Sequence, residues 1–170
     1  MSFQKLMIKQ IKKESVKIKK IQSNYSGRTF QLISLVGSAL GTHYAFVLLF
    51  PLLLWFGEDS FVGIITTTTW TTCIVNIFKD LFQLPRPFVA KNDLVESVLE
   101  EFGLPSTHTA NATAIAISVS CLVQGRFVYT LFVRLLLFFY VFLTGFSRLI
   151  YGVHSFIDLY SGAFVGTFPK

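Results

Sequence analysis

The sequence predicts an all-α, polytopic membrane protein, and three observations support that fold class. Hydrophobic residues make up 52% of the 170 positions, charged residues only 14%, and the mean hydropathy is +0.59. Charged residues usually supply about a quarter of a soluble domain. The apolar residues also gather in stretches long enough for membrane helices, which need roughly 20 residues each. An ordinary water-soluble domain is therefore excluded, and the length suits one membrane domain of a few spans.

The N-terminal segment 1–28 is basic and amphipathic. Eight of the 15 Lys and Arg residues lie within it, and apolar side chains recur among the lysines of residues 3–21. Such a helix suits an anionic membrane surface, whereas a run of lysines is also typical of a solvated tail. The sequence leaves both interpretations open. The segment lacks the apolar core and cleavage site of a secretory signal peptide, so we expect no cleaved leader.

Apolar segments follow the basic segment, and we expect them to form the membrane domain 29–170. The longest break between them is the polar connection 85–104. Pro85 and Pro87 end the second segment, because proline removes a backbone donor and disfavours a helical conformation in the residue before it. Pro105 suits the first turn of the third segment. The five segments are 29–56, 61–84, 105–124, 127–150 and 154–168.

Four ends of these segments meet at one membrane face if the chain crosses up and down. They are the end of the second segment, the start of the third, the end of the fourth and the start of the fifth. An ionisable residue at membrane depth costs several kcal/mol unless it is paired or lines a cavity, so a cluster of them is a candidate functional site. The polar residues expected at this level are Lys79, Arg86, Ser106, His108, Arg148, His154 and Asp158.

The cations of this cluster indicate an anion with several oxygens as the ligand. The guanidinium groups of Arg86 and Arg148 match phosphate through paired hydrogen bonds, and Lys79 adds a point charge. The hydroxyl of Ser106 and the unpaired backbone donors of a helix start favour the same anion. Phosphate is therefore the natural candidate.

The histidines of the cluster suit phosphoryl transfer. His154 and Asp158 are four residues apart, so on a helix the carboxylate can bind one imidazole nitrogen and leave the other as a nucleophile. His108 comes from a different segment and can donate a proton to a leaving oxygen. Glu96, Glu100 and Glu101 could bind a metal ion, but the acidic residues of 93–101 lack the spacing of a recognised metal cage and are more typical of a solvated loop face.

Other polar residues have simpler interpretations. The threonines of 66–72 are expected to bond to the helix backbone and to pack against other helices rather than to serve as nucleophiles. Asn111 lies one turn from His108, and it either orients that histidine or joins two helices. His43 is expected to have a structural partner.

Three separated motifs in these segments match a known pattern. They read K-x6-R-P at 79–87, P-S-x-H at 105–108 and S-R-x5-H-x3-D at 147–158. With all three complete and in order over residues 28–168, the chain resembles the type 2 phosphatidic acid phosphatase (PAP2) superfamily. Within it, the stretches around the first two motifs and at 40–55 look most like sphingosine-1-phosphate and long-chain-base-1-phosphate phosphatases.

The resemblance implies a helical bundle of the PAP2 and vanadium-haloperoxidase-like type that removes phosphate from a lipid through a phosphohistidine, without metal or cofactor. By motif position, His154 would be the nucleophile, Asp158 its orienter and His108 the acid that protonates the departing oxygen. The residues that would hold the phosphoryl oxygens are Lys79, Arg86, Ser106 and Arg148.

The favoured substrate is a long-chain-base 1-phosphate in a membrane, and no nucleic acid is expected to bind. Phosphatidic acid, lysophosphatidic acid or a polyprenyl diphosphate is the alternative substrate, and head-group transfer is a less favoured reaction. Segment 154–168 is shorter than the roughly 17 residues of a span. We therefore expect a truncated final core helix, which leaves an inactive remnant as a further alternative. The sequence leaves the oligomeric state open.

The side of the membrane also stays open. The resemblance implies an endoplasmic reticulum protein with its site facing the lumen. The basic N-terminus is expected in the cytosol, and two spans before the first motif would return the site to the cytosolic face. The two expectations conflict unless segment 29–56 fails to cross as a single helix.

Overall fold

The computed structural model describes residues 3–25, 27–39, 51, 55, 59–87, 102–123 and 125–168. The extended elements of regular structure in these ranges are all helices, which confirms the all-α prediction. The helices are α1 (Phe3–Asn24), α2 (Arg28–Ala39), α4 (Asp59–Phe82), α6 (Thr107–Leu122), α7 (Phe127–Tyr151) and α8 (Phe156–Val165).

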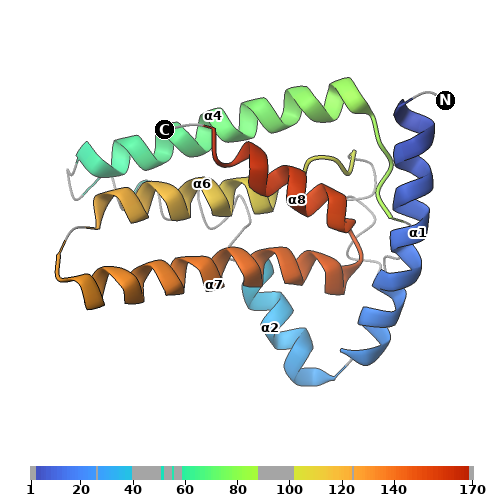
Figure 1. Cartoon of the computed structure of the whole chain (residues 1–170), viewed down its shortest axis with the longest axis horizontal. Helices are drawn as coiled ribbons and strands as arrows, with labels where there is room; N and C mark the ends of the chain where they lie inside the picture. The colour runs from blue at the N-terminus through green and yellow to red at the C-terminus, as the bar shows by residue number, and fades with distance from the viewer. Residues whose placement is uncertain are drawn as a thin grey trace.

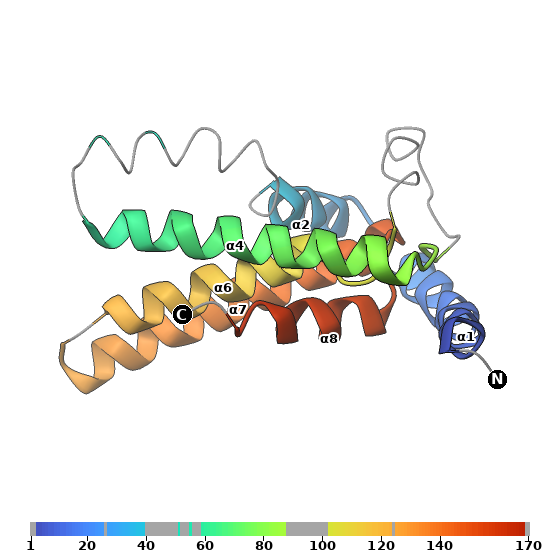
Figure 2. The same cartoon turned by 90° about the horizontal axis from the view of Figure 1, so that it is seen from above.

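Three long helices run alongside one another and carry the fold. Figures 1 and 2 show α6 between α4 and α7, with the shorter α8 beside them. Helix α6 packs against α4, α7 and α8, and α2 packs against α7. Helix α6 is therefore the central element of the bundle.

The predicted segments agree closely with these helices. Helices α4, α6 and α7 begin and end within two residues of segments 61–84, 105–124 and 127–150. Segment 29–56 begins as α2, but residues 40–50 lie outside the described residues, and so does His43. Helix α4 stops at Phe82, because the next residue, Gln83, adopts a positive φ of 48° ahead of the prolines.

The threonines of α4 bond to their own helix, as predicted. Hydroxyl groups donate to the carbonyl four residues earlier at Thr66, Thr68, Thr69, Thr71 and Thr72. Thr72 also pairs with Asn111, whose Nδ2 donates to the Thr72 hydroxyl over 3.0 Å. Of the two roles considered for Asn111, the structure therefore supports the one that joins helices.

Helix α7 is the one described helix that is both long and apolar enough to cross a membrane. Large apolar side chains project from it, including Phe127, which is 79% exposed, and Phe138, which is 72% exposed. Helix α4 is of similar length, but its polar threonines reduce its hydropathy. Helix α8 is apolar but has only 10 residues.

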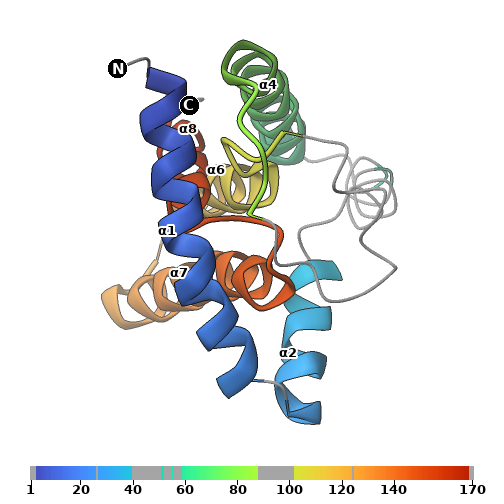
Figure 3. The same ribbon diagram turned by 90° about the vertical axis from the view of Figure 1, so that its right-hand side faces the viewer.

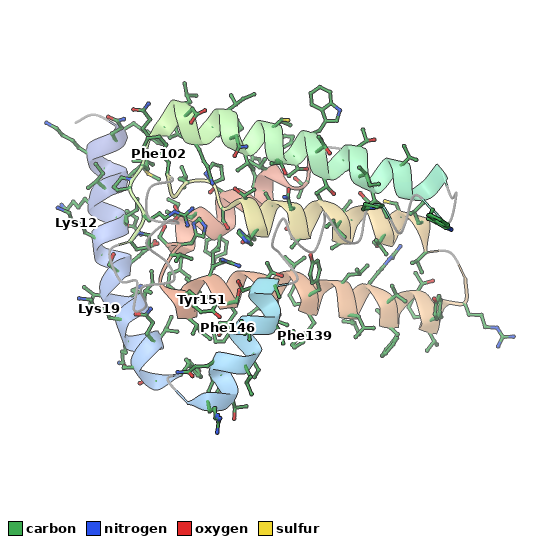
Figure 4. All side chains as sticks on the ribbon, turned by 180° about the vertical axis from the view of Figure 1, so that it is seen from behind. Lys12, Lys19, Phe102, Phe139, Phe146 and Tyr151 are labelled. Carbon is green, nitrogen blue, oxygen red and sulfur yellow. The ribbon has the colours of Figure 1, made fainter. Side chains whose placement is uncertain are left out.

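Helix α1 lies across one end of the bundle (Figure 3). The predicted helix is present, and its apolar face packs against the protein: Met7 and Ile11 form a cluster with Leu84 and Leu104. The lysines labelled in Figure 4 point away from the bundle. The sequence interpretations did not include this packing, and the choice between a solvated and a membrane-facing basic surface stays a prediction.

Candidate functional site

The polar cluster predicted from the sequence lies at the end of the bundle that α1 crosses. Nη1 of Arg86, just beyond α4, lies 3.4 Å from Nε2 of His154, which precedes α8. The backbone N–H of Ser106, at the start of α6, donates to the carbonyl of Asp158 over 2.9 Å. The structure thus brings the second and third motifs together at the backbone and joins the first to the third through side chains.

His154 reaches this position through the turn that ends α7. Gly152 adopts a left-handed φ of 69° and its N–H bonds back to the last turn of α7. A left-handed residue at a helix C-terminus is usually glycine, because a Cβ would be strained there. The N–H of Val153 then donates to the carbonyl of Arg148 over 3.2 Å. This turn closes α7 and directs the next residue, His154, into the site.

Asp158 is held by the start of α8. The N–H of Ser155 donates to Oδ2 of Asp158 over 2.7 Å, and the N–H of Asp158 donates to the Ser155 hydroxyl oxygen over 3.3 Å, which makes a reciprocal capping box. The same Oδ2 lies 3.5 Å from Nδ1 of His154. Both side chains are almost fully buried, with exposures of 0% for Asp158 and 1% for His154.

The predicted pairing of His154 with Asp158 is therefore present, but the predicted reason for it is wrong. His154 lies before the N-cap Ser155, so the two residues do not share a face of one helix. The capping box directs the carboxylate back toward the preceding turn instead. The spacing of Ser155 and Asp158 is itself a sequence signal for a capping box, and it identifies Ser155 as a residue that the sequence analysis missed.

The cations lie at the same end of the bundle. Arg86 donates from Nη1 to the carbonyl of Val153 over 3.4 Å. Arg148 is 7% exposed and donates from Nη2 to the Ser38 hydroxyl over 2.6 Å. Lys79, in the last turn of α4, is also 7% exposed. The sequence carried no signal for Ser38, because its role depends on how α2 packs against α7.

Ser106 and His108 both belong to the start of α6. Ser106 is the N-cap residue, fully buried, and its hydroxyl oxygen accepts from the N–H and the hydroxyl of Thr109. These bonds use the oxygen as an acceptor, so its proton can still be donated to an anion. His108 lies in the first turn of α6 and is half-buried.

Gly103 allows the chain segments of the site to approach closely. Its N–H donates to the carbonyl of Leu84 over 2.8 Å. A Cβ at this position would lie 3.3 Å from both Cα of Arg86 and Oδ2 of Asp158. Glycine therefore lets the loop before α6 lie directly against the first and third motifs, a role that the sequence analysis did not assign.

The hydrogen bonding of the site is incomplete. Four buried side-chain polar atoms in the described part of the chain lack a hydrogen-bond partner, and three of them belong to Arg148, His154 and Asp158. The fourth belongs to Thr144, one turn before Arg148. Unpartnered buried polar atoms are costly and uncommon in folded proteins. Of these atoms, Nε of Arg148 is a cationic donor that an anion could satisfy, whereas Nδ1 of His154 faces Oδ2 of Asp158.

The electrostatic environment keeps the His154 imidazole neutral. Burial lowers its pKa to about 4, while the neighbouring carboxylate of Asp158 raises it and the charges of Arg86 and Arg148 lower it. Arg86 and Arg148 also lie close enough for their charges to repel each other. An anion between them would relieve that repulsion. The site therefore combines a neutral imidazole with excess positive charge.

The described residues hold no cluster of three or more His, Cys, Asp or Glu side chains that could bind a metal ion. The acidic residues Glu96, Glu100 and Glu101 lie outside the described ranges. The donors that surround His154 are mainly cationic and hydroxyl groups, and these suit an anion better than a metal.

Comparisons with known proteins place the chain beside one superfamily of phosphatases. The PAP2 superfamily profile matches residues 60–168, the part of the chain that contains all three motifs. A dihydrosphingosine 1-phosphate phosphatase of Saccharomyces cerevisiae is 34% identical over 138 residues, which cover 76% of this chain and 34% of that protein. Sphingosine-1-phosphate phosphatase 1 of Mus musculus is 32% identical over 75% of this chain and 30% of that protein. The chain spans about a third of the length of these relatives.

Two solved structures share the fold. The crystal structure of Aquifex aeolicus LpxE matches with a TM-score of 0.68 and 25% identity, over 89% of this chain and 88% of that one. The transmembrane PAP2-type phosphatidylglycerolphosphate phosphatase of Bacillus subtilis matches with a TM-score of 0.73 and 16% identity, over 89% of this chain and 78% of that one. The expected membrane-bundle architecture is confirmed.

Proposed function

Because the chain belongs to the PAP2 superfamily, we propose that it is a membrane lipid phosphatase that hydrolyses a long-chain-base 1-phosphate, such as sphingosine-1-phosphate or dihydrosphingosine-1-phosphate. The observation that carries the proposal is a buried, neutral His154 held between the carboxylate of Asp158 and the guanidinium of Arg86. The names of the two curated relatives support the substrate class. The proposed location is the endoplasmic reticulum membrane, as the resemblance to this subfamily implies.

The orientation of His154 determines which nitrogen reacts. Nδ1 faces Oδ2 of Asp158, so this nitrogen carries the proton in the neutral ring. Nε2 then presents its lone pair toward Nη1 of Arg86, the position at which a phosphoryl group would bind. In the first step Nε2 attacks phosphorus, the N–P bond forms and the P–O bond to the lipid breaks. Asp158 stabilises the positive charge that develops on the ring.

His108 supplies and recovers the proton in this proposal. In its protonated form it donates to the lipid oxygen as that oxygen leaves, so the long-chain base departs as an alcohol. The neutral His108 then takes a proton from the water that attacks the phosphohistidine. The N–P bond breaks, His154 is regenerated and inorganic phosphate leaves. His108 comes from the first turn of α6, a different element from the α7–α8 turn that carries His154.

The cations and Ser106 hold the phosphoryl oxygens in the proposed complex. Phosphoryl transfer depends mainly on positioning and on stabilising charge over the equatorial oxygens. The buried Nε of Arg148 lacks a hydrogen-bond partner, and Arg86 and Arg148 repel each other. A bound phosphate dianion would accept a hydrogen bond from Nε of Arg148, and its charge would offset the repulsion between the two guanidinium groups. Lys79 would add a third charge from the end of α4.

The test is phosphate release by the membrane-embedded chain in the presence of EDTA. Sphingosine-1-phosphate, dihydrosphingosine-1-phosphate and phosphatidic acid are compared for the unmodified protein and for His154→Ala. Tyr160→Phe, on the exposed side of α8, is the matched control. We expect release from the first two lipids, loss of at least a thousandfold in His154→Ala, and no change in Tyr160→Phe.

Other outcomes would contradict the mechanism, the substrate or the phosphatase function. Turnover that persists in His154→Ala contradicts the phosphohistidine mechanism, and inhibition by EDTA contradicts the metal-independent reaction. Release mainly from phosphatidic acid keeps the mechanism and changes the substrate. A folded protein that releases phosphate from none of the three lipids contradicts the phosphatase function and favours the inactive remnant.

A further inference from the structure

Helix α1 contacts the chain ends that form the site. Nε2 of Gln4 donates to the carbonyl of Phe82 at the end of α4 over 3.3 Å. Nε2 of Gln22 donates to the carbonyl of Ile150 in the last turn of α7 over 2.9 Å. Between these two contacts, α1 meets the start of α8 through Glu14. Figure 3 shows α1 passing across this end of the bundle, where it joins segments that are far apart in the sequence.

Glu14 is unusual for its helix. It is the one acidic residue of the 22 in α1, which is otherwise rich in lysine, and it faces inward with 7% exposure. A buried carboxylate is costly unless hydrogen bonds compensate it. Oε1 of Glu14 accepts from Nε2 of Gln10 over 2.8 Å, and Oε2 accepts from the backbone N–H of Ile157 over 3.3 Å. The carboxylate of Glu14 therefore accepts hydrogen bonds from Gln10 and from the start of α8, not from the lysines of its own helix.

The contact with Ile157 adds to the cap of α8. The first N–H groups of a helix have no partner within the helix. The hydroxyl oxygen of Ser155 accepts from the N–H of Asp158, and Oε2 of Glu14 accepts from the N–H of Ile157. A carboxylate at a helix N-terminus is also favoured by the helix dipole. Helix α8 has only 10 residues, and so short a helix depends on tertiary contacts for its stability.

The capped turn of α8 includes Asp158, the residue whose carboxylate faces the proposed nucleophile His154. Ile157 precedes Asp158, whose Oδ2 is bonded to the Ser155 N–H and lies 3.5 Å from Nδ1 of His154. A displacement of the first turn of α8 would therefore move this carboxylate relative to the imidazole. A misplacement of about 1 Å can cost as much as a hundredfold in rate.

From these contacts we propose that Glu14 is a positioning residue, which holds the first turn of α8 so that Asp158 orients His154. This inference rests on the proposed function. Glu14 touches neither the reacting atoms nor the proposed phosphate position. It acts through the Ile157 N–H, and it makes α1 part of the machinery that aligns the site rather than an attached basic segment.

The test compares Glu14→Ala, Glu14→Gln and the control Gln22→Ala in the full chain. Glu14→Gln keeps an oxygen that can accept from Ile157, whereas Glu14→Ala removes it. Gln22→Ala deletes a different bond from α1 to the bundle without touching α8. We expect Glu14→Ala to lower kcat about tenfold with KM within twofold. Glu14→Gln should recover most of kcat, and Gln22→Ala should leave it unchanged.

Amide hydrogen exchange over residues 156–159 gives a second readout that needs no turnover. We expect exchange there to be faster in Glu14→Ala than in Glu14→Gln or Gln22→Ala. If Glu14→Ala fails to fold, Glu14→Asp replaces it in both measurements. Aspartate keeps the charge, but its side chain is one methylene shorter, so we expect a weaker bond to the Ile157 N–H, a lower kcat and faster exchange.

Two results would overturn the role of Glu14. One is an unchanged kcat in Glu14→Ala, and the other is an equal loss in Gln22→Ala, which would reflect a general loosening of α1. If the unmodified protein hydrolyses none of the lipids, the proposed function fails, and the exchange rates alone decide the role of Glu14. Equal exchange in all variants would then exclude it.

Discussion

The two halves of α7 present opposite surfaces. The first half exposes large apolar side chains, with Phe132 at 59% exposure and Phe138 at 72%. The second half buries polar ones, with Thr144 and Ser147 fully buried and Arg148 at 7%. One continuous helix therefore joins an apolar surface to a polar interior within a few turns.

The two halves of α7 suit different surroundings, hydrocarbon for the first half and the protein interior at the candidate site for the second. Apolar side chains without protein neighbours suit a hydrocarbon surrounding, where they need no specific partner. The buried polar side chains of the second half must find partners within the protein, and the Ser147 hydroxyl does so by donating to the carbonyl of Thr144 over 2.7 Å. Two side-chain atoms of this half still lack a partner, Oγ1 of Thr144 and Nε of Arg148. Substitutions at the polar end should consequently have much larger effects than substitutions at the apolar end.

The largest effect in this comparison is expected from Asp158→Asn. The amide keeps the size of the side chain but no longer stabilises a charged imidazole or favours the reactive tautomer. We expect kcat/KM to fall by about 10²- to 10³-fold, while a thermal melt shows that the protein stays folded. A loss below tenfold would show that Asp158 serves mainly as the cap of α8.

The next effect concerns two glycines at opposite ends of the bundle. A Cβ at Gly162 would lie 2.5 Å from the carbonyl oxygen of Ser106, whereas a Cβ at Gly63 would meet nothing within 4 Å. We expect Gly162→Ala to lower the free energy of unfolding by about 1–3 kcal/mol. Gly63→Ala should raise it by up to about 1 kcal/mol, because alanine favours a helix. Denaturation in detergent measures both, and equal effects would contradict the close packing of α8 on α6.

The third expected effect is a loss of folding stability at acidic pH. Burial of His154 lowers its pKa to about 4, below the usual value of 6.5, so the folded protein binds this proton less readily than the unfolded chain. Its contribution to stability is complete above pH 6.5 and is lost as the pH falls from 6.5 toward 4. NMR titration of labelled histidine, with His154→Ala to assign the signal, measures the pKa directly. A value above 6 would contradict the neutral, desolvated imidazole.

The smallest effect is expected at the apolar end of α7. Phe132→Leu exchanges one exposed apolar side chain for another, so the free energy of unfolding should change by less than about 0.5 kcal/mol and kcat/KM should not change. A large loss of activity in this variant would show that the apolar half of α7 also contributes to the site.

Most helix boundaries and the candidate residues followed from local features of the sequence. Prolines, apolar run lengths and the three motifs act over a few residues, so α4, α6 and α7 were predicted to within two residues. The pairing of His154 with Asp158 was also predicted, but from a shared helix that the structure does not contain. Its cause is the capping box with Ser155, which the sequence spacing could have indicated.

The contacts of Ser38 and Glu14 could not be predicted in this way. Ser38 receives a hydrogen bond from Arg148, 110 positions away, and Glu14 accepts from Ile157, 143 positions away. Neither residue stands in a motif. Each has its role only because α2 lies on α7 and α1 crosses the start of α8.

The helical class, the order of the helices and the residue types expected at the site could all be predicted from local properties, namely hydrophobic periodicity, proline and motif spacing. The groups that support those residues became visible only in the packed fold. Hydrogen bonds and burial depend on distances between segments far apart in the chain, and the packing of α1, α2 and α8 determines those distances. That packing left His154 buried beside Asp158 and brought Glu14, the one acidic residue of α1, within hydrogen-bond distance of the Ile157 N–H.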